Sequence, residues 1–170
     1  LVMAALEGGA EALLFAAGMA ASAAVFQALS PGARVAAPAR MYHGTLTWLR
    51  ALAEKMRFEL ALYDPADPDA IEAAVGGRVD LVWVETPANP SWEVTDVARA
   101  AALAHAAGGL LAVDNTVPTP VLTRPLALGA DVVVHSATKY LNGHSDLTAG
   151  VVVLPEGSPL GAGLRFGRKH

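Results

Sequence analysis

One short segment of the sequence combines amine and hydroxyl chemistry directly after an apolar run. The segment HSATKYLNGHSD, residues 135–146, follows the run 131–134 and contains Lys139, one of only three lysines in the chain. A lysine held near a partly desolvated site loses proton affinity, and its amine then becomes a usable nucleophile. Ser136 and Thr138 flank this lysine with hydroxyl groups that suit phosphate oxygens. The segment therefore predicts an amine nucleophile beside an anion-binding site.

Three other segments place polar or small residues at similar positions. Asp114 ends GGLLAVDNT, although taken alone it is better explained as a turn-forming or helix-capping aspartate. In MYHGT, Tyr42 precedes the flexible Gly44, and its ring either stacks on a planar ligand or packs in the core. In FAAGMAAS, Gly18 joins an expected strand to an expected helix, whose free N–H groups would suit a phosphate. Each signal is weak alone, and their combination carries the interpretation.

The elements that position these residues indicate a doubly wound α/β fold. Strands are expected at residues 12–15, 34–37, 59–63, 81–85, 110–114, 131–135 and 150–154. Helices are expected near residues 19–29, 43–55, 68–75 and 94–107. Runs such as LVWVE and DVVVH are apolar throughout, which is typical of parallel strands covered by helices on both faces. Because ligands bind beyond the carboxyl ends of such strands, we expect the polar segments at one edge of the sheet.

Composition limits the classes of protein that the chain can belong to. Of its 170 residues, 54% are hydrophobic and 16% charged, which argues against a disordered chain, and the length predicts one domain or a large piece of one. A net charge of -4 gives no electrostatic case for binding nucleic acid. The absence of cysteine excludes disulfides and thiolate metal sites and fits a cytoplasmic location.

The uncharged stretch 12–33 is long enough to cross a bilayer, yet we expect no membrane span there. Gly18 and the Pro31-Gly32 pair interrupt it, and no basic cluster flanks it. A buried strand followed by a helix explains the stretch better. No basic leader or small-residue cleavage site is visible, so no signal peptide is expected either.

The combined residues require a ligand with a phosphate, a flat ring, a basic ring atom and a carbonyl group. Pyridoxal 5′-phosphate (PLP) meets all four demands. In this interpretation Asp114 keeps the pyridine nitrogen protonated, so that the ring can accept electrons. Lys139 forms an imine with the cofactor's aldehyde and later carries protons.

The same segments resemble, in order and spacing, the Cys/Met-metabolism (transsulfuration) family of PLP-dependent enzymes. The resemblance rests on FAAGMAA, YHGT, ETPANP, VDNT and HSATKYLNGHSDLTAGVVV, of which the last is highly specific, and it covers nearly the whole chain. The family includes cystathionine γ-synthase, cystathionine γ-lyase, cystathionine β-lyase, methionine γ-lyase and the homoserine-ester sulfhydrylases. The resemblance implies a PLP domain of fold type I, with a mostly parallel seven-stranded sheet between layers of helices.

The resemblance also implies roles for individual residues. Lys139 matches the lysine that is bound to PLP, and Asp114 matches the partner of the pyridine nitrogen. Tyr42 matches a tyrosine that stacks on the ring and takes part in proton transfer, and Asn89 matches the residue facing the phenolic oxygen. The remaining implied contacts are the amides of Gly18 and Met19 and the hydroxyls of Ser136 and Thr138 on the phosphate, Thr116 near the cofactor, and Glu85 behind it.

Three residues depart from the family pattern. Ala17 stands where the family usually has serine or threonine, which removes one hydroxyl from the phosphate site. His43 replaces the usual glycine after the tyrosine. Gly44 stands where methionine γ-lyases typically carry a cysteine, so the resemblance disfavours that activity.

The extent of the chain departs from the family as well. We expect residues 1–170 to be the central PLP-binding domain, without the family's N-terminal arm and C-terminal domain. The tyrosine and arginine that a neighbouring subunit lends to the phosphate would then be missing. Arg165 and Arg168 lie too early to match the arginine that holds the substrate carboxylate. The intact enzyme is expected to be a homodimer or homotetramer, and this chain alone is expected to have little or no activity.

The implied activity is that of a PLP-dependent lyase or transferase acting on a small amino acid. We rank first the γ- (or β-) elimination or replacement of a group on sulfur-containing or O-acylhomoserine amino acids, most like cystathionine γ-synthase or γ-lyase. One alternative is a truncated, non-catalytic remnant that binds PLP weakly or not at all. Another is a different fold-type I enzyme, such as an aminotransferase or an amino-acid decarboxylase. A nicotinamide-binding domain is disfavoured because GAGLRFG, residues 161–167, follows no βαβ opening.

Overall fold

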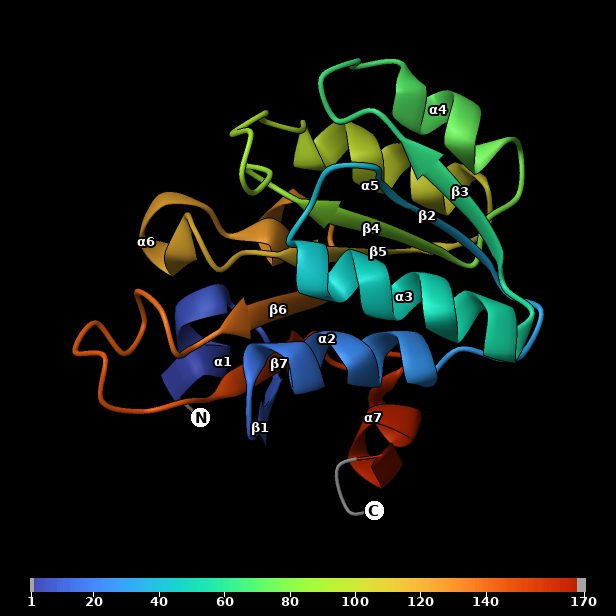
Figure 1. Cartoon of the computed structure of the whole chain (residues 1–170). Coiled ribbons are helices and arrows are strands. Elements are labelled where there is room, and N and C mark those ends of the chain that lie inside the picture. The colour runs from blue at the N-terminus through green and yellow to red at the C-terminus, as the bar shows by residue number, and fades with distance from the viewer. Residues whose placement is uncertain (1, 168–170) are drawn as a thin grey trace.

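The computed structural model describes residues 2–167, which fold around one central seven-stranded sheet (Figure 1). The strands are β1 (Glu11–Phe15), β2 (Arg34–Pro38), β3 (Glu59–Tyr63), β4 (Leu81–Glu85), β5 (Leu110–Asp114), β6 (Val132–Ser136) and β7 (Gly150–Leu154). They lie in the order β1-β7-β6-β5-β4-β2-β3. Strand β7 is antiparallel to both neighbours, and the other pairs are parallel. The predicted mostly parallel sheet is confirmed.

Helices cover both faces of this sheet, as the doubly wound prediction requires. One face packs against α2 (Gly18–Gln27), α3 (His43–Met56) and α7 (Gly161–Gly167). The other face packs against α1 (Val2–Glu7), α4 (Ala70–Val75), α5 (Val97–Ala106) and the 3-10 helix η1 (Pro125–Leu128). The short helix α6 (Thr119–Leu122) follows the carboxyl end of β5.

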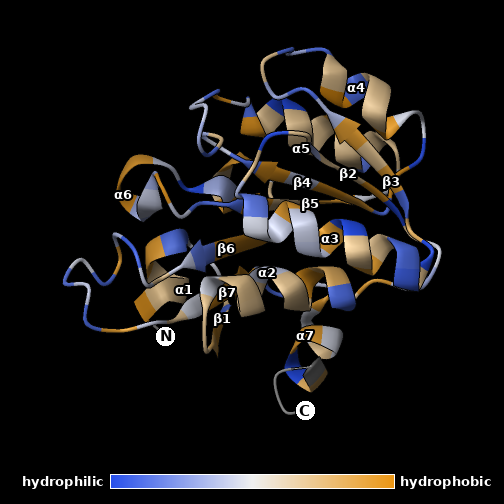
Figure 2. Ribbon diagram, viewed as in Figure 1, coloured by the Kyte–Doolittle hydropathy of each residue, from blue (hydrophilic) through white to orange (hydrophobic). Residues whose placement is uncertain are grey.

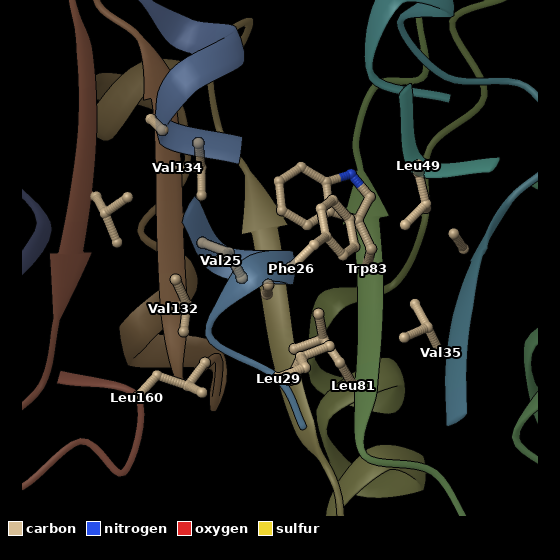
Figure 3. Packing of buried hydrophobic residues seen from close by; sticks show 14 of the residues in the cluster. Val25, Phe26, Leu29, Val35, Leu49, Leu81, Trp83, Val132, Val134 and Leu160 are labelled. Atoms are coloured by element: carbon tan, nitrogen blue, oxygen red, sulfur yellow. The ribbon is translucent and has the colours of Figure 1, made fainter. Parts of the chain in front are cut away.

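The core on the α2–α3 face is built from aromatic and branched side chains. The rings of Phe26 in α2 and Trp83 in β4 lie 4.8 Å apart between their centroids (Figure 3). Val132 and Val134 of β6 face the same helices. All five residues of β4 are buried, and so are all five of β7, which explains why those runs are apolar except for Glu85 at the end of β4. Figure 2 shows the resulting apolar sheet between helices whose polar residues face outward.

The structure differs from the sequence prediction mainly in its short helices and in some helix ends. Residues 2–7, 119–122 and 161–167 form helices that the periodicity did not predict, because each is too short to show a repeating apolar face. Helix α5 begins at Val97 instead of near residue 94, since the carboxylate of Asp96 accepts the amide of Arg99 at 3.0 Å and caps it. No helix within residues 2–167 is long and apolar enough to cross a membrane.

Candidate active site

Three polar side chains end adjacent parallel strands on the same face of the sheet. Glu85 of β4 pairs in register with Asp114 of β5, and Asp114 pairs with Val134, two residues before Ser136. Alternate residues of a strand point to the same face of the sheet. The residue two positions before each of these three side chains belongs to the core that packs under α2 and α3. Glu85, Asp114 and Ser136 therefore point toward the amino ends of these helices. The expectation that the polar segments share one edge of the sheet is met.

Asp114 is held through one of its two carboxylate oxygens. Its Oδ1 accepts the amide of Thr116 at 3.0 Å and the hydroxyl of Thr116 at 2.5 Å. The same hydroxyl oxygen accepts the amide of Ser136 at 2.8 Å, so Thr116 ties the ends of β5 and β6 together. Burial raises the pKa of Asp114, while the bonds from Thr116 and the charge of His135 lower it. Within the described chain Oδ2 receives no hydrogen bond, which leaves it open to a ligand donor.

Glu85 fastens the two loops that carry Tyr42 and Asn89. Its Oε2 accepts the amide of Tyr42 at 2.9 Å, and its Oε1 accepts the amide of Asn89 at 2.9 Å. The side chain is buried, and this burial, with the charge of Asp114, raises the pKa of Glu85 to about 7. The sequence suggested only that Glu85 lies behind the cofactor, and the structure shows what it holds.

Tyr42 stands directly before α3 with its ring exposed. Tyr42 is 41% exposed, and the centroid of its ring is 5.2 Å from that of the His43 ring. It also leans over Gly44, where an added Cβ would come within 2.8 Å of Tyr42 Cε1. A side chain at position 44 would thus displace the ring. Asn89 is exposed as well, so both groups are open to a ligand.

The amino end of α2 forms a close-packed cradle on the ends of β6 and β7. Ala17 precedes the helix in an extended conformation and provides no side-chain cap, so the first helical amides are free to bind a ligand. A Cβ on Gly18 would lie 2.5 Å from the Cβ of Ser136, and a Cβ on Gly150 would collide with the carbonyl of Ala17. Free amides at the positive end of a ten-residue helix suit an anion such as phosphate.

Of the remaining predicted phosphate contacts, the amide of Met19 is free within the described chain and the hydroxyl of Thr138 is already engaged. Met19 follows Gly18 in α2, so its amide belongs to the cradle, while its sulfur accepts the hydroxyl of Thr45 at 3.3 Å. The hydroxyl of Thr138 donates to the carbonyl of Ala149 at 3.2 Å and accepts the amide of Ala149 at 3.0 Å. Thr138 therefore closes the loop between β6 and β7. Its contact with a phosphate stays a prediction.

Lys139 lies in the turn that follows β6, three residues beyond the strand. Its amide donates to the carbonyl of Ser136 at 3.1 Å, and its carbonyl accepts the amide of Gly143 at 2.9 Å. The residue is exposed in the described chain, because the turn carries it past the end of the strand. Its partial desolvation beside a bound cofactor stays a prediction.

Arg165, near the carboxyl end, does not join the site in the described structure. Arg165 donates to Glu11 at 2.5 Å, at the start of β1. Since β1 runs parallel to β6, this contact lies at the opposite edge of the sheet. Arg168 falls outside the described residues. The expectation that Arg165 does not hold a substrate carboxylate agrees with this placement.

These groups fit PLP chemically. The cradle at Gly18 offers amides to a phosphate, and Oδ2 of Asp114 is open to a ring N–H. The exposed ring of Tyr42 can stack on a flat ligand, and Lys139 has an accessible amine for its aldehyde. A Cβ at Gly18 would collide with Ser136, so glycine lets the start of α2 approach the end of β6. Sequence reasoning missed the buried partners Glu7 and His135, because nothing in the local pattern relates them to the site.

Comparison with known proteins shows that the chain is similar to enzymes. The chain is 45% identical over 152 residues to cystathionine gamma-synthase of Escherichia coli K12 and 46% identical over 153 residues to L-methionine gamma-lyase of Pseudomonas deceptionensis. Each alignment covers 89% of this chain but only 39% and 38% of those relatives, respectively, so the chain spans about two-fifths of their length.

Solved structures agree with these sequence matches. Cystathionine gamma synthase from Xanthomonas oryzae pv. oryzae, solved in complex with cystathionine, has a TM-score of 0.92 and 40% sequence identity. The superposition covers 98% of this chain and 43% of that one. The profile of the family described as "Cys/Met metabolism PLP-dependent enzyme" matches residues 1–169. Because this match takes in almost every residue, the chain belongs to the family of PLP-dependent enzymes of Cys/Met metabolism.

Proposed function

We propose that this chain holds PLP in an enzyme that eliminates or replaces a group at Cγ, or at Cβ, of a sulfur-containing or O-acylhomoserine amino acid. Cystathionine γ-synthase and γ-lyase are the activities we rank first. Family membership and the names of the similar enzymes support the reaction class. The observation that carries the assignment is the placement of Asp114 beside the α2 cradle, at the edge from which Lys139 projects.

Asp114 is proposed to hold the proton on the ring nitrogen of the bound cofactor. When bound, PLP supplies an aldehyde for amines and a ring that accepts the electron pair of a broken bond to Cα. Asp114 must be ionised for its role, although burial raises its pKa. The hydroxyl and amide of Thr116 counter this effect by bonding to Oδ1. Thr116 thus favours the charged form of the carboxylate and fixes its direction.

Lys139 is proposed to hold the cofactor through its aldehyde, and the free Nζ would take the proton from Cα of the substrate. Its exposed position in the turn after β6 leaves the amine free to move between these roles. Tyr42, held by Glu85 through its amide, would stack on the ring and assist in moving protons. Asn89, held by the same carboxylate, would face the phenolic oxygen.

The phosphate is proposed to bind the amides of Gly18 and Met19 and the hydroxyl of Ser136, with Thr138 as a further contact. The first three lie together where α2 meets the end of β6. Residues 1–170 would then form the central cofactor-binding domain of the enzyme. We further propose that the enzyme works in the cytoplasm as a homodimer or homotetramer.

Two activities are less well supported. Methionine γ-lyase is ranked lower because Gly44 stands where the resemblance implies a cysteine in those enzymes. An aminotransferase is disfavoured because the matched family and the named relatives are lyases and synthases of Cys/Met metabolism. A non-catalytic remnant would carry the site residues without turnover, and the following experiment separates it from an enzyme.

The test is turnover of cystathionine, O-succinylhomoserine, O-acetylhomoserine and methionine by the PLP-loaded intact enzyme that contains this chain. We expect turnover of cystathionine or an acylhomoserine, and its loss in Lys139→Ala. The control is Lys55→Ala, which removes an exposed lysine of α3 and should leave turnover unchanged. Residues 1–170 alone should show little or no activity. An intact enzyme that turns over none of the four substrates, or a Lys139→Ala variant as active as the control, would contradict the proposal.

A further inference from the structure

A buried polar cluster lies on the opposite face of the sheet from the proposed cofactor site. It consists of Glu7 at the end of α1, Asn115 just after β5, and His135 in β6. Glu7 Oε1 accepts Asn115 Nδ2 at 2.8 Å and lies 2.6 Å from His135 Nε2. The side chains of Glu7 and His135 are 0% exposed. A polar side chain removed completely from water needs such hydrogen-bond partners, because burying it without them costs free energy.

The two partners of Glu7 are chain neighbours of site residues. Asn115 follows Asp114, and His135 precedes Ser136. The amide of Asn115 continues the pairing of β5 with β6 by donating to the carbonyl of Val134 at 2.9 Å. A single carboxylate therefore spans the two strand ends that present Asp114 and Ser136 on the other face.

The same strand ends are tied on the site face by Thr116, which bonds to both Asp114 and Ser136. On the opposite face, Glu7 connects the same two strand ends through Asn115 and His135. Asn115 is further anchored because its Nδ2 also donates to the carbonyl of Thr123 at 2.9 Å. The relative position of Asp114 and Ser136 is thus fixed from both faces of the sheet.

The cluster is poorly explained as a device for stability. Within the described chain Glu7 Oε2, Asn115 Oδ1 and His135 Nδ1 are buried without a hydrogen-bond partner. Incompletely paired polar clusters cost stability relative to an apolar core of the same volume. Packed around them are the apolar Ala4, Val133 and Val151, so an apolar residue would suit the surroundings. A cost of this kind is typical of residues that orient a site.

We propose that Glu7 is a positioning residue for the cofactor site, whose carboxylate fixes Asn115 and His135 and thereby sets the spacing of Asp114 and Ser136. This inference rests on the proposed PLP-binding function. The length of the Glu7 side chain decides whether these contacts form, because both partners contact the same oxygen, Oε1. Residues that orient ligand-binding residues from behind contribute about 10- to 100-fold to affinity in metal sites, and we expect a similar scale here.

Two conservative variants separate reach from charge. Glu7→Gln keeps the length and an acceptor oxygen for Asn115, whereas Glu7→Asp keeps the charge and shortens the side chain. We expect the PLP dissociation constant, from absorbance titration of the purified chain, to rise at least about 10-fold in Glu7→Asp and less than about 3-fold in Glu7→Gln. The matched control is Glu11→Asp at the opposite edge of the sheet, which should stay within about 2-fold.

Amide hydrogen exchange of the cofactor-free chain provides a second readout, independent of PLP. The amides of Asn115 and Ser136 should exchange faster in Glu7→Asp but not in Glu7→Gln, with global stability checked by urea unfolding. If the unmodified chain binds no PLP, the proposed function fails while exchange still decides the positioning role. Unchanged exchange in Glu7→Asp, or equal loss of PLP affinity in both variants, overturns the inference.

Discussion

Glu85 and Asp114 are neighbouring carboxylates at the ends of β4 and β5, and their environments give them different tasks. Asp114 keeps one oxygen open to a ligand, whereas Glu85 is closed off by the amides of Tyr42 and Asn89. Burial and the charge of Asp114 raise the pKa of Glu85 to about 7. A carboxyl with this pKa changes its charge near neutral pH, which makes its contribution measurable.

Glu85→Gln should change how stability depends on pH. The pKa of Glu85 is raised from 4.5 to about 7 in the folded chain, so protonated Glu85 favours folding. Its stabilising contribution is full below about pH 4.5 and is lost as pH rises through 7, a change of about 3 kcal/mol. Glutamine stays neutral but offers one acceptor oxygen to the amides of Tyr42 and Asn89, so it carries a hydrogen-bonding cost that does not depend on pH. We expect the unfolding free energy of the variant, relative to the unmodified chain, to rise by about 2–3 kcal/mol between pH 4.5 and pH 8.

Urea unfolding of both proteins between pH 4.5 and pH 8 measures this difference. Asp114 also has a raised pKa, so part of the pH dependence should persist in the variant. Parallel curves for the two proteins would show that Glu85 titrates at its ordinary pKa.

Ala17→Ser should restore a hydroxyl at the start of α2. Ala17 is extended and provides no cap, and an N-cap serine stabilises a helix by about 1 kcal/mol relative to alanine. We expect a higher unfolding free energy of about this size in the cofactor-free chain, and tighter PLP binding through the added donor. Ala16→Ser, one residue earlier, is the control. An Ala17→Ser variant with neither gain would mean that the position cannot serve as a cap.

Site residues could be predicted from the sequence only where they end, or come shortly after, a strand that the sequence itself predicts. Lys139, Asp114 and Ser136 follow apolar runs, so the rule that ligands bind beyond strand ends identified them. Glu7 gave no such signal, since it lies 108 residues from Asn115 and 128 from His135 in the chain. The exposure of Lys139 was also unpredictable, because the path of a turn depends on contacts such as that of Thr138 with Ala149.

At the scale of elements, the strands were predicted to within one residue at each end, whereas several helices were not. Continuous apolar runs define the strands because both faces are buried. The six residues of α1 lack the length to show a repeat, and this helix buries only Ala4 and Glu7. Its existence depends on packing against β6 and β7, which the local sequence does not encode.

Helix α2 connects the core to the site, so weakening its packing should weaken cofactor binding. Phe26 is fully buried against Trp83, four residues from Ser22, which bonds to the carbonyl of Gly18 at 3.2 Å. We expect Phe26→Ala to lower the unfolding free energy by about 3–5 kcal/mol and to raise the PLP dissociation constant. Leu14→Ala, at an exposed position of β1, is the control for urea unfolding and PLP titration. A large loss of stability with unchanged PLP affinity would show that the packing of α2 does not affect PLP binding at its amino end.

At the scale of the whole molecule, family membership confirms the predicted fold type and the cofactor, PLP. The chain spans about two-fifths of its relatives' length, and apolar side chains are exposed beside the proposed site. Val121 and Leu122 of α6 are 87% and 81% exposed, and Tyr140 follows Lys139 at 64%. Figure 1 shows α6 and the loop after β6 on the same side of the molecule. A surface of this kind is typical of protein interfaces.

Val121→Asp should weaken assembly of the intact enzyme if α6 lies in its subunit interface. A charge in a buried interface is costly, so we expect sedimentation to show more dissociated subunits at equal concentration. Val2→Asp, also exposed but on α1, is the control. Unchanged assembly in Val121→Asp would place the interface elsewhere.

The central claim is that Lys139 is the covalent anchor of PLP, and peptide mapping tests it most directly. The chain is mixed with PLP, reduced with borohydride and digested, and the modified peptide is identified by mass spectrometry. We predict one dominant adduct, on the peptide that contains Lys139, and its absence in Lys139→Ala. A dominant adduct on another lysine, or an undiminished yield in Lys139→Ala, would contradict the account.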